Sequence, residues 1–219
     1  MRFCKTLWVS ILVLLCVGCA VNLTAANVPP PATDLPSPGA GKVATAVLSG
    51  GCFWGVEAVF ERLKGVIAVV AGYAGGKAEE AHYERVETGR TKHAESVQIT
   101  YDPSQISYGK LLQVFFAVAH DPTLIDRQGP DFGPQYRSVI WYSTDGQKQV
   151  AQAYITQIAR AKVFRDPMAT QVSVLPGFFP AEDHHQHYLQ RNPNDPYIVQ
   201  NDLPKLKGLE RQFPDLLKP

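Results

Sequence analysis

One cysteine of the chain lies among three glycines, in the segment SGGCFWGVE. A β-branched, apolar run before Cys52 predicts a strand, and the spacing of apolar residues from Val56 onward predicts a helix. Cys52 would then lie at a helix N-terminus, where free N–H groups and the positive end of the helix dipole favour a thiolate. We therefore expect a lowered thiol pKa and an accessible nucleophile, rather than the buried structural cysteine that is the common alternative.

Aromatic and acidic residues that could surround this sulfur come from three segments. Phe53 and Trp54 follow the cysteine directly and could wall an apolar pocket, although such pairs more often pack in a core. Tyr83 lies in a polar loop, and Asp131 and Tyr136 lie where a Gly/Pro-rich loop meets a predicted strand. A tyrosine hydroxyl can donate a hydrogen bond to an oxygen that develops negative charge.

Glu95 stands in the alternating segment AESVQITYD. Its position has the same parity as Val97, Ile99 and Tyr101, so these four side chains point to one face of the predicted strand. If that face is buried, the Glu95 carboxyl is desolvated, its pKa rises towards neutrality and it can donate a proton. If Glu95 lies beyond the edge of the core, it is solvated. The sequence leaves both alternatives open.

The segment EDHHQH suggests a metal site, because His184 and His187 are three residues apart and Cys52 or His120 could complete a ligand set. Zinc sites usually show recognisable ligand spacing and often more than one sulfur. We therefore expect no metal here, and we interpret these histidines as solvated or as lying behind the site.

The elements that must position these residues alternate along the chain. Strands are predicted at residues 42–51, 66–76, 94–103, 137–143 and 170–176, and helices at residues 56–64, 107–121, 145–163 and 180–192. The opening order, strand–helix–strand–strand, matches the split β-α-β motif. The sequence thus predicts an α+β fold with a split β-α-β, ferredoxin-like core, a mixed or antiparallel sheet, helices on its faces and long loops.

The N-terminal residues differ from the rest of the chain. Residues 1–20 combine a positive start, a short apolar run and small residues, which is the pattern of a secretion signal. Cleavage after Ala20 and lipid attachment at Cys19, as in a bacterial lipoprotein, both fit. Residues 21–42 read as a proline-rich linker and residues 43–219 as the catalytic domain. We expect an exported, periplasmic or extracytoplasmic protein.

Composition and cysteine count narrow the class of protein. The 219 residues are 45% hydrophobic and 19% charged, with a net charge of +1 and no Lys/Arg stripe, which excludes a nucleic-acid groove. Cys4, Cys16 and Cys19 all lie in the signal region, so Cys52 is the thiol of the domain. A single unpaired thiol in an exported protein points to reactivity.

Between about Val43 and Asn192 the sequence resembles the peptide-methionine (S)-S-oxide reductases, the A-type methionine sulfoxide reductases. The resemblance is carried by GGCFWGVE, GYAGG, HAESVQITYDP, HDPT, QYRSVIWY and PAEDHHQHYLQRNP, in that order. It implies reduction of free and protein-bound methionine-S-sulfoxide, and hence repair of oxidised proteins. It also implies that no flavin, nicotinamide or metal takes part.

The resemblance further implies a role for each candidate around the sulfur. Cys52 would be the nucleophile that attacks the sulfoxide sulfur and becomes a sulfenic acid. Glu95 would protonate the sulfoxide oxygen, and Phe53 and Trp54 would hold the substrate methyl group.

Four further residues match family positions near the pocket. By the same resemblance, Tyr83 and Tyr136 would hydrogen-bond the sulfoxide oxygen, and Asp131 would support the pocket. His185 would lie close to the site, with a supporting role.

Many relatives carry resolving cysteines near the C-terminus, whereas this chain has no cysteine after Cys52. A disulfide relay within one mature chain would need an unlipidated Cys19. We therefore expect an external thiol, either a thioredoxin-like protein or a small thiol, to reduce the sulfenic acid. We also expect a monomer, because no apolar segment is left over for a partner chain.

Two other functions remain open from the sequence. A cysteine hydrolase or acyl-transferase could use Cys52 with a histidine such as His185, and would act on an ester or amide without a reductant. A non-enzymatic lipoprotein could bind a thiol or a metal through HHQH, and would show no turnover.

Overall fold

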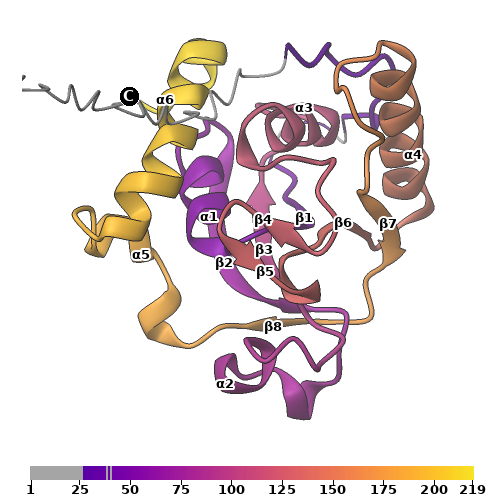
Figure 1. The fold of residues 1–219 in the computed structure, drawn as a ribbon. Helices are drawn as coiled ribbons and strands as arrows, with labels where there is room; N and C mark the ends of the chain where they lie inside the picture. Colours follow the sequence, from indigo (N-terminus) through magenta and orange to yellow (C-terminus); the bar gives the residue numbers. More distant parts are fainter. Residues whose placement is uncertain (1–26, 38, 40) are drawn as a thin grey trace, which may run out of the picture.

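The computed structural model describes residues 27–37, 39 and 41–219. Within these residues the main sheet has the strand order β7-β6-β1-β3-β2-β8 (Figure 1). The strands are β1 (Ala44–Gly50), β2 (Val66–Ala74), β3 (Ala94–Tyr101), β6 (Ser138–Tyr142), β7 (Gln171–Val174) and β8 (Phe178–Pro180). Neighbouring strands are antiparallel except β6 and β7, which are parallel, so the sheet is mixed.

The centre of the sheet is built from the first three strands. β3 lies between β1 and β2, and Val97 of β3 faces Leu48 on one side and Ala71 on the other. The helix α1 (Phe53–Glu61) connects β1 to β2, and β6 pairs with the other edge of β1. This is a split β-α-β arrangement. The α+β class, the split β-α-β core and the mixed sheet predicted from the sequence are confirmed.

Helices cover the sheet and enclose most of the core. α1 packs on β2 and β3, and α3 (Tyr108–Val114), extended by a π-helical turn (Phe115–Ala119), packs beside α4 (Asp145–Arg160). Leu48, Phe60 and Leu111 are fully buried in this layer. Full burial of such a side chain contributes about 1.5–3 kcal/mol, so this layer holds the first turn of α1 in place over the sheet. A smaller cluster around Trp141 lies on the other side of the strands, under Leu175 and Phe178.

The C-terminal third differs from the sequence prediction. The helix predicted at residues 180–192 is wrong: the chain forms the edge strand β8, a 3-10 turn (Asp183–His185) and the short α5 (Tyr188–Arg191). The Gln186 side chain donates to Ala71 O (2.9 Å) and accepts from Ala71 N (3.0 Å), so an amide extends the pairing of β2 beyond the backbone hydrogen bond from Ala181 N to Ala71 O. A further helix, α6 (Leu203–Gln212), preceded by a π-helical turn (Ile198–Asp202), was not predicted.

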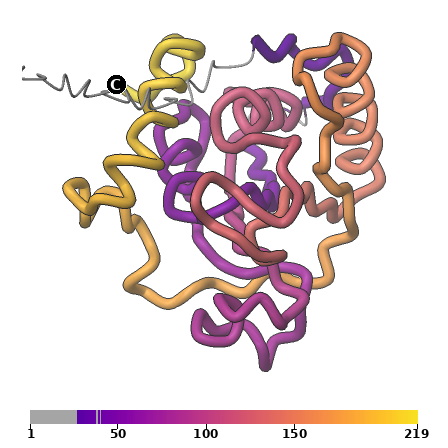
Figure 2. The backbone as a smooth tube through the Cα atoms, in the orientation of Figure 1, coloured from indigo at the N-terminus to yellow at the C-terminus, as the bar shows by residue number. Residues whose placement is uncertain are grey.

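The proline-rich segment makes close contacts with the helices. Val28 is only 4% exposed, and the Tyr154 hydroxyl of α4 donates to Pro29 O at 2.6 Å. Asp34 accepts from the backbone N–H of Gly109 in α3 at 2.8 Å. In Figure 2 this segment, in indigo, runs beside the orange tube of α4. Residues from Val28 onward therefore already pack on the domain, although the sequence suggests that the folded domain starts near Val43.

The signal peptide predicted at residues 1–20 lies outside the described residues. None of the helices that the structure does describe combines the length and the apolar character needed to cross a membrane.

Candidate active site

Cys52 occupies the sharp corner between β1 and α1, as the N-cap residue of the helix. Gly51, directly before it, has φ +93°, a left-handed conformation that glycine adopts without strain. A Cβ at Gly51 would lie 2.6 Å from the side chain of Gln128, so the corner also needs a residue without a side chain. The glycines of the motif thus hold the sulfur at the end of the sheet.

A pocket of about 320 Å³ opens beside this corner. It brings together all seven residues that the sequence analysis names as catalytic or substrate-contacting, together with two that it missed. The lining residues are Cys52, Phe53, Trp54, Tyr83, Glu95, Asp131, Tyr136, Asp195 and Tyr197. The long loops supply several of them, through the short helix α2 (Tyr83–Val86) and the hairpin of β4 (Arg127–Gln128) and β5 (Asp131–Phe132).

Glu95 is buried at the start of β3, with 3% of its surface exposed. Its Oε2 accepts a hydrogen bond from the backbone N–H of Phe53 at 3.0 Å. Burial, helped by the nearby charge of Asp131, raises the pKa of Glu95 to about 8, against the opposing effect of that hydrogen bond. Of the two alternatives for this residue, the buried one is therefore correct. At neutral pH the carboxyl is mostly protonated and can donate a proton.

The lowered pKa expected for Cys52 is wrong. The side chain is only 8% exposed, and burial raises the thiol pKa well above its ordinary value. The charges of Glu95 and Asp202 add to this rise, and the N–H of Trp54 at the helix N-terminus opposes it only in part. Desolvation thus outweighs the helix dipole, which the sequence alone could not weigh.

The aromatic wall of the pocket, formed by Phe53 and Trp54, packs against His185 and Tyr188. The Trp54 ring stacks on Tyr188 with ring centroids 3.7 Å apart, and its Nε1–H donates to His185 Nδ1 at 3.2 Å. His185 is 3% exposed and lies 5.2 Å from the Phe53 ring centroid, and burial lowers its pKa. Because Nδ1 is occupied by Trp54 and the ring does not line the pocket, His185 is poorly placed to be the base of a cysteine hydrolase.

The phenols of the pocket are kept protonated. Burial, followed by the charge of Glu95, raises the pKa of Tyr83 to about 12, and the same two causes raise the pKa of Tyr136. The Tyr197 hydroxyl donates a short hydrogen bond to Asp131 Oδ2. Tyr197 was missed because it follows a turn 66 positions away from its partner and carries no local signal.

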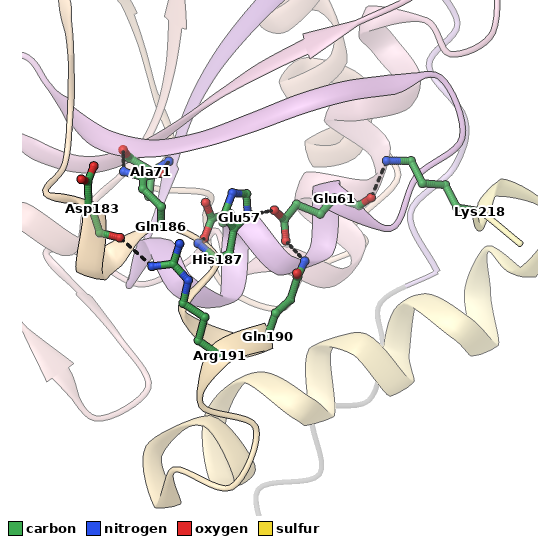
Figure 3. A network of polar contacts seen from close by, with 9 residues as sticks. All are labelled: Glu57, Glu61, Ala71, Asp183, Gln186, His187, Gln190, Arg191 and Lys218. Carbon is green, nitrogen blue, oxygen red and sulfur yellow. Dashed lines mark hydrogen bonds and ion pairs between the residues drawn. The ribbon is translucent and has the colours of Figure 1, made fainter.

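A polar network joins α1 to the segment that follows β8 (Figure 3). His187 Nδ1 lies 2.5 Å from Glu61 Oε1, and the His187 backbone N–H donates to Glu57 Oε2 at 2.8 Å. Gln190 Nε2 donates to Glu61 Oε2, also at 2.8 Å. Among the described residues, Glu57, Glu61 and His187 form the group that could gather around a metal, and it includes neither His184 nor the cysteine. Direct contacts within the group make it a link between elements.

Comparison with known proteins agrees with this geometry. The family model for peptide methionine sulfoxide reductase matches residues 44–216. The peptide methionine sulfoxide reductase MsrA 2 of Mesorhizobium japonicum is 55% identical over 172 residues, which are 78% of this chain and 88% of that protein. The protein of the same name from Synechocystis sp. is 54% identical over 173 residues, which are 79% of this chain and 81% of that protein.

Solved structures give the same result. Reduced Mxr1 from Saccharomyces cerevisiae has a TM-score of 0.63 and 31% identity, covering 74% of this chain and 92% of that one. Methionine sulfoxide reductase A of Corynebacterium diphtheriae has a TM-score of 0.60 and 36% identity, covering 71% of this chain and 77% of that one. The chain therefore belongs to the peptide methionine sulfoxide reductase family, and it is an oxidoreductase that reduces methionine sulfoxide.

Proposed function

We propose that Cys52 attacks the sulfur of methionine-S-sulfoxide, free or within a peptide, while Glu95 protonates the oxygen. The observation that carries this proposal is that one pocket holds the Cys52 sulfur, the buried acid Glu95 and three phenols beside the rings of Phe53 and Trp54. A methyl sulfoxide has an apolar methyl group and a partly negative oxygen. Phe53 and Trp54 suit the methyl group, and the acid suits the oxygen.

The proposed step balances without a cofactor. The Cys52 thiol loses its proton to solvent, and the thiolate forms a bond to the sulfoxide sulfur as the Glu95 proton passes to the oxygen. The sulfur–oxygen bond and the new bond between the two sulfurs then break, the hydroxyl ends on the Cys52 sulfur as a sulfenic acid, and the thioether leaves. The proton released by the thiol is balanced when Glu95 takes one up from solvent. Methionine sulfur gains the two electrons that the cysteine sulfur loses.

Two phenols can stabilise negative charge on the oxygen, and Asp131 acts on the acid. The hydroxyls of Tyr83 and Tyr136 remain protonated at physiological pH and line the same pocket, so they can donate to the developing oxyanion. The negative charge of Asp131 raises the pKa of Glu95 and thereby favours the protonated acid.

Regeneration of Cys52 uses a thiol from another molecule. Cys52 is the only cysteine after residue 19, so the sulfenic acid has no neighbouring thiol in the domain with which to form a disulfide. A thioredoxin-like protein or a small thiol condenses with it, releasing water and leaving a mixed disulfide. A second thiol then releases reduced Cys52 as a new disulfide forms.

The site of action follows from residues 1–20, whose pattern supports export and repair of oxidised exported proteins. Lipid attachment at Cys19 and cleavage after Ala20 leave mature N-termini of different mass, so mass spectrometry of protein from membranes distinguishes them. The enzyme acts as a monomer, and light scattering after size exclusion tests this.

The deciding experiment supplies the S and R epimers of a peptide methionine sulfoxide to protein lacking residues 1–20, with dithiothreitol as reductant. The expected result is methionine from the S epimer alone, and none from Cys52→Ser. Trapping the enzyme after one turnover with dimedone should add one label at Cys52. Folded protein that turns over neither epimer, with Cys52 still a free thiol, contradicts the proposal.

A further inference from the structure

A buried ion pair lies behind the catalytic cysteine, at the start of α6. Lys205 Nζ donates to Asp202 Oδ1 at 3.0 Å, with side-chain exposures of 18% and 0%. Asp202 Oδ2 is buried and has no hydrogen-bond partner among the described residues. A charged pair withdrawn from water costs free energy unless it stabilises something else, so its position is informative.

The pair approaches the first turn of α1 closely. A Cβ at Gly55 would lie 2.7 Å from Lys205 Nζ and closer still to Asp202 Oδ1. Gly55 is three residues after Cys52, in the first turn of the helix that Cys52 caps. The third glycine of the motif therefore leaves space for this ion pair.

The charges around the pair come from several elements. Lys205 interacts with Asp202, with Cys52 and with Asp131 of β5, and its charge also disfavours protonation of His120. At Cys52, Glu95 of β3 and Asp202 oppose a negative sulfur, whereas Lys205 and the Trp54 N–H favour it. Lys205 and Asp202 thus act on the same sulfur with opposite signs.

We propose that Lys205 is a positioning residue that supplies the positive charge against which the Cys52 thiolate forms, and that Asp202 holds and limits that charge. The proposal rests on the proposed function only in that this thiolate is the one that attacks the sulfoxide. Because neither residue lines the pocket, the pair acts through the sulfur rather than on the substrate. Its position in α6 makes the C-terminal segment part of the catalytic machinery.

A purely structural pair would behave differently. If it only joined α6 to α1, removing either partner would leave one buried charge unpaired, and both variants would lose stability and activity in the same direction. If it sets the charge at Cys52, removing the cation disfavours the thiolate and removing the anion favours it.

The test uses Lys205→Met, Asp202→Asn and the double variant, in protein lacking residues 1–20, where Cys52 is the sole cysteine. The rate of alkylation by iodoacetamide is measured from pH 6 to pH 10, because this rate follows the thiolate fraction. We expect the rate at pH 8 to fall about tenfold in Lys205→Met, to rise about tenfold in Asp202→Asn, and to return near the parent value in the double variant.

Steady-state kinetics on a peptide methionine-S-sulfoxide complete the test. Lys205→Met should lower kcat about tenfold and leave KM within about twofold, since the pocket lining is intact. Changes of the same sign in the two single variants, or an unchanged alkylation rate in folded Lys205→Met, overturn the proposal. If Lys205→Met does not fold, the direction of the change in alkylation rate in Asp202→Asn still tests the proposal. Alkylation needs no sulfoxide turnover, so a failure here is distinct from a failure of the reductase function.

Discussion

Burial controls the ionisation of the residues at the centre of the pocket. Glu95 and Cys52 both have raised pKa values, and burial is the largest cause for each. At neutral pH the pocket therefore holds a protonated acid next to a neutral thiol. A sulfoxide that enters brings an oxygen able to accept the Glu95 proton, and the thiolate is needed only at that stage.

Glu95 predicts a pH dependence. An acid with a folded-state pKa of about 8 is available below that pH and is lost as the pH rises through it. The thiolate fraction of Cys52 still grows above pH 8, because the pKa of Cys52 is higher than that of Glu95. We therefore expect kcat/KM of the parent enzyme to rise with pH and to level off near pH 8, where Glu95 loses its proton. Glu95→Gln should lower kcat about 100- to 1,000-fold, and its kcat/KM should keep rising above pH 8. Exposed Glu79→Gln is the control, and a kcat/KM that levels off near pH 8 in Glu95→Gln would refute the assignment.

Glu57 predicts a pH dependence of stability. It is fully buried, and burial followed by the charge of Glu61 raises its pKa from 4.5 to about 8. The folded state then binds a proton that the unfolded state releases, so stability falls as the pH rises from about 5 to 8. We expect Glu57→Gln to reduce this fall by about 2 kcal/mol, measured by urea unfolding at both pH values. Parallel curves for the variant and the parent would contradict it.

Glu95 and Glu57 show which features of a site the sequence pattern can predict and which need the structure. The two-residue period of a strand was enough to place Glu95 on the same face as Val97 and Ile99, although its burial needed the structure. The helical spacing from Val56 gives no sign that Glu57 is buried, because the segment around His187 that covers it is distant in sequence. Tyr197 and Lys205 escaped notice because Asp131 and Cys52, on which they act, are distant from them in sequence.

At the scale of elements, strands and helices with strong periodicity were predicted and the C-terminal elements were not. β1, β2, β3 and α4 follow from apolar alternation or helical spacing. Residues 180–192 have helix-like composition, yet β8 pairs with β2 and His187 takes a left-handed conformation with φ 53°, which breaks the helix. Tertiary contacts with the sheet edge outweigh local propensity there.

The contact between α1 and α6 predicts opposite effects for two glycines. Gly55→Ala would place a methyl group against Asp202 and Lys205, so we expect a loss of about 1–3 kcal/mol in the free energy of unfolding, together with lower kcat. Gly208→Ala, within α6, meets no atom closer than 3.9 Å and should gain about 0.5–1 kcal/mol from helix propensity. Urea unfolding of both variants checks the contrast. A gain in the free energy of unfolding in both variants would contradict this contrast, because it would show that α6 can shift at little cost to accommodate a methyl group at Gly55.

At the scale of the whole molecule, segments distant in sequence complete the layers around one sheet. α6 closes the side of α1, and the connection from β7 to β8 covers the small cluster around Trp141. The proline-rich segment lies against α3 and α4 (Figure 1). Composition alone describes this segment as a linker, because its prolines form no periodic apolar pattern. Its hydrogen bonds to the helices are made largely through its own backbone carbonyls and the Asp34 carboxylate.

Removal of the proline-rich segment should therefore lower the free energy of unfolding and leave the catalytic activity unchanged. Val28 fills a buried site, and its carbonyl accepts from Gln113 Nε2 at 2.8 Å, while Tyr154 and Gln157 donate to Pro29 O and Pro30 O at 2.6 and 2.8 Å. The burial of one valine and a few hydrogen bonds, minus the entropy cost of ordering the segment, should contribute about 2–3 kcal/mol to the free energy of unfolding.

Protein comprising residues 43–219 should thus unfold at lower urea than protein comprising residues 27–219, with kcat and KM unchanged, because the contacted residues lie in α3 and α4 and not in the pocket. Protein comprising residues 21–219 is the control, and it should match residues 27–219 in stability. Equal stability of the 43–219 and 27–219 proteins would mean that the segment is a linker in solution. A loss of activity at full folding would mean that the segment also reaches the site.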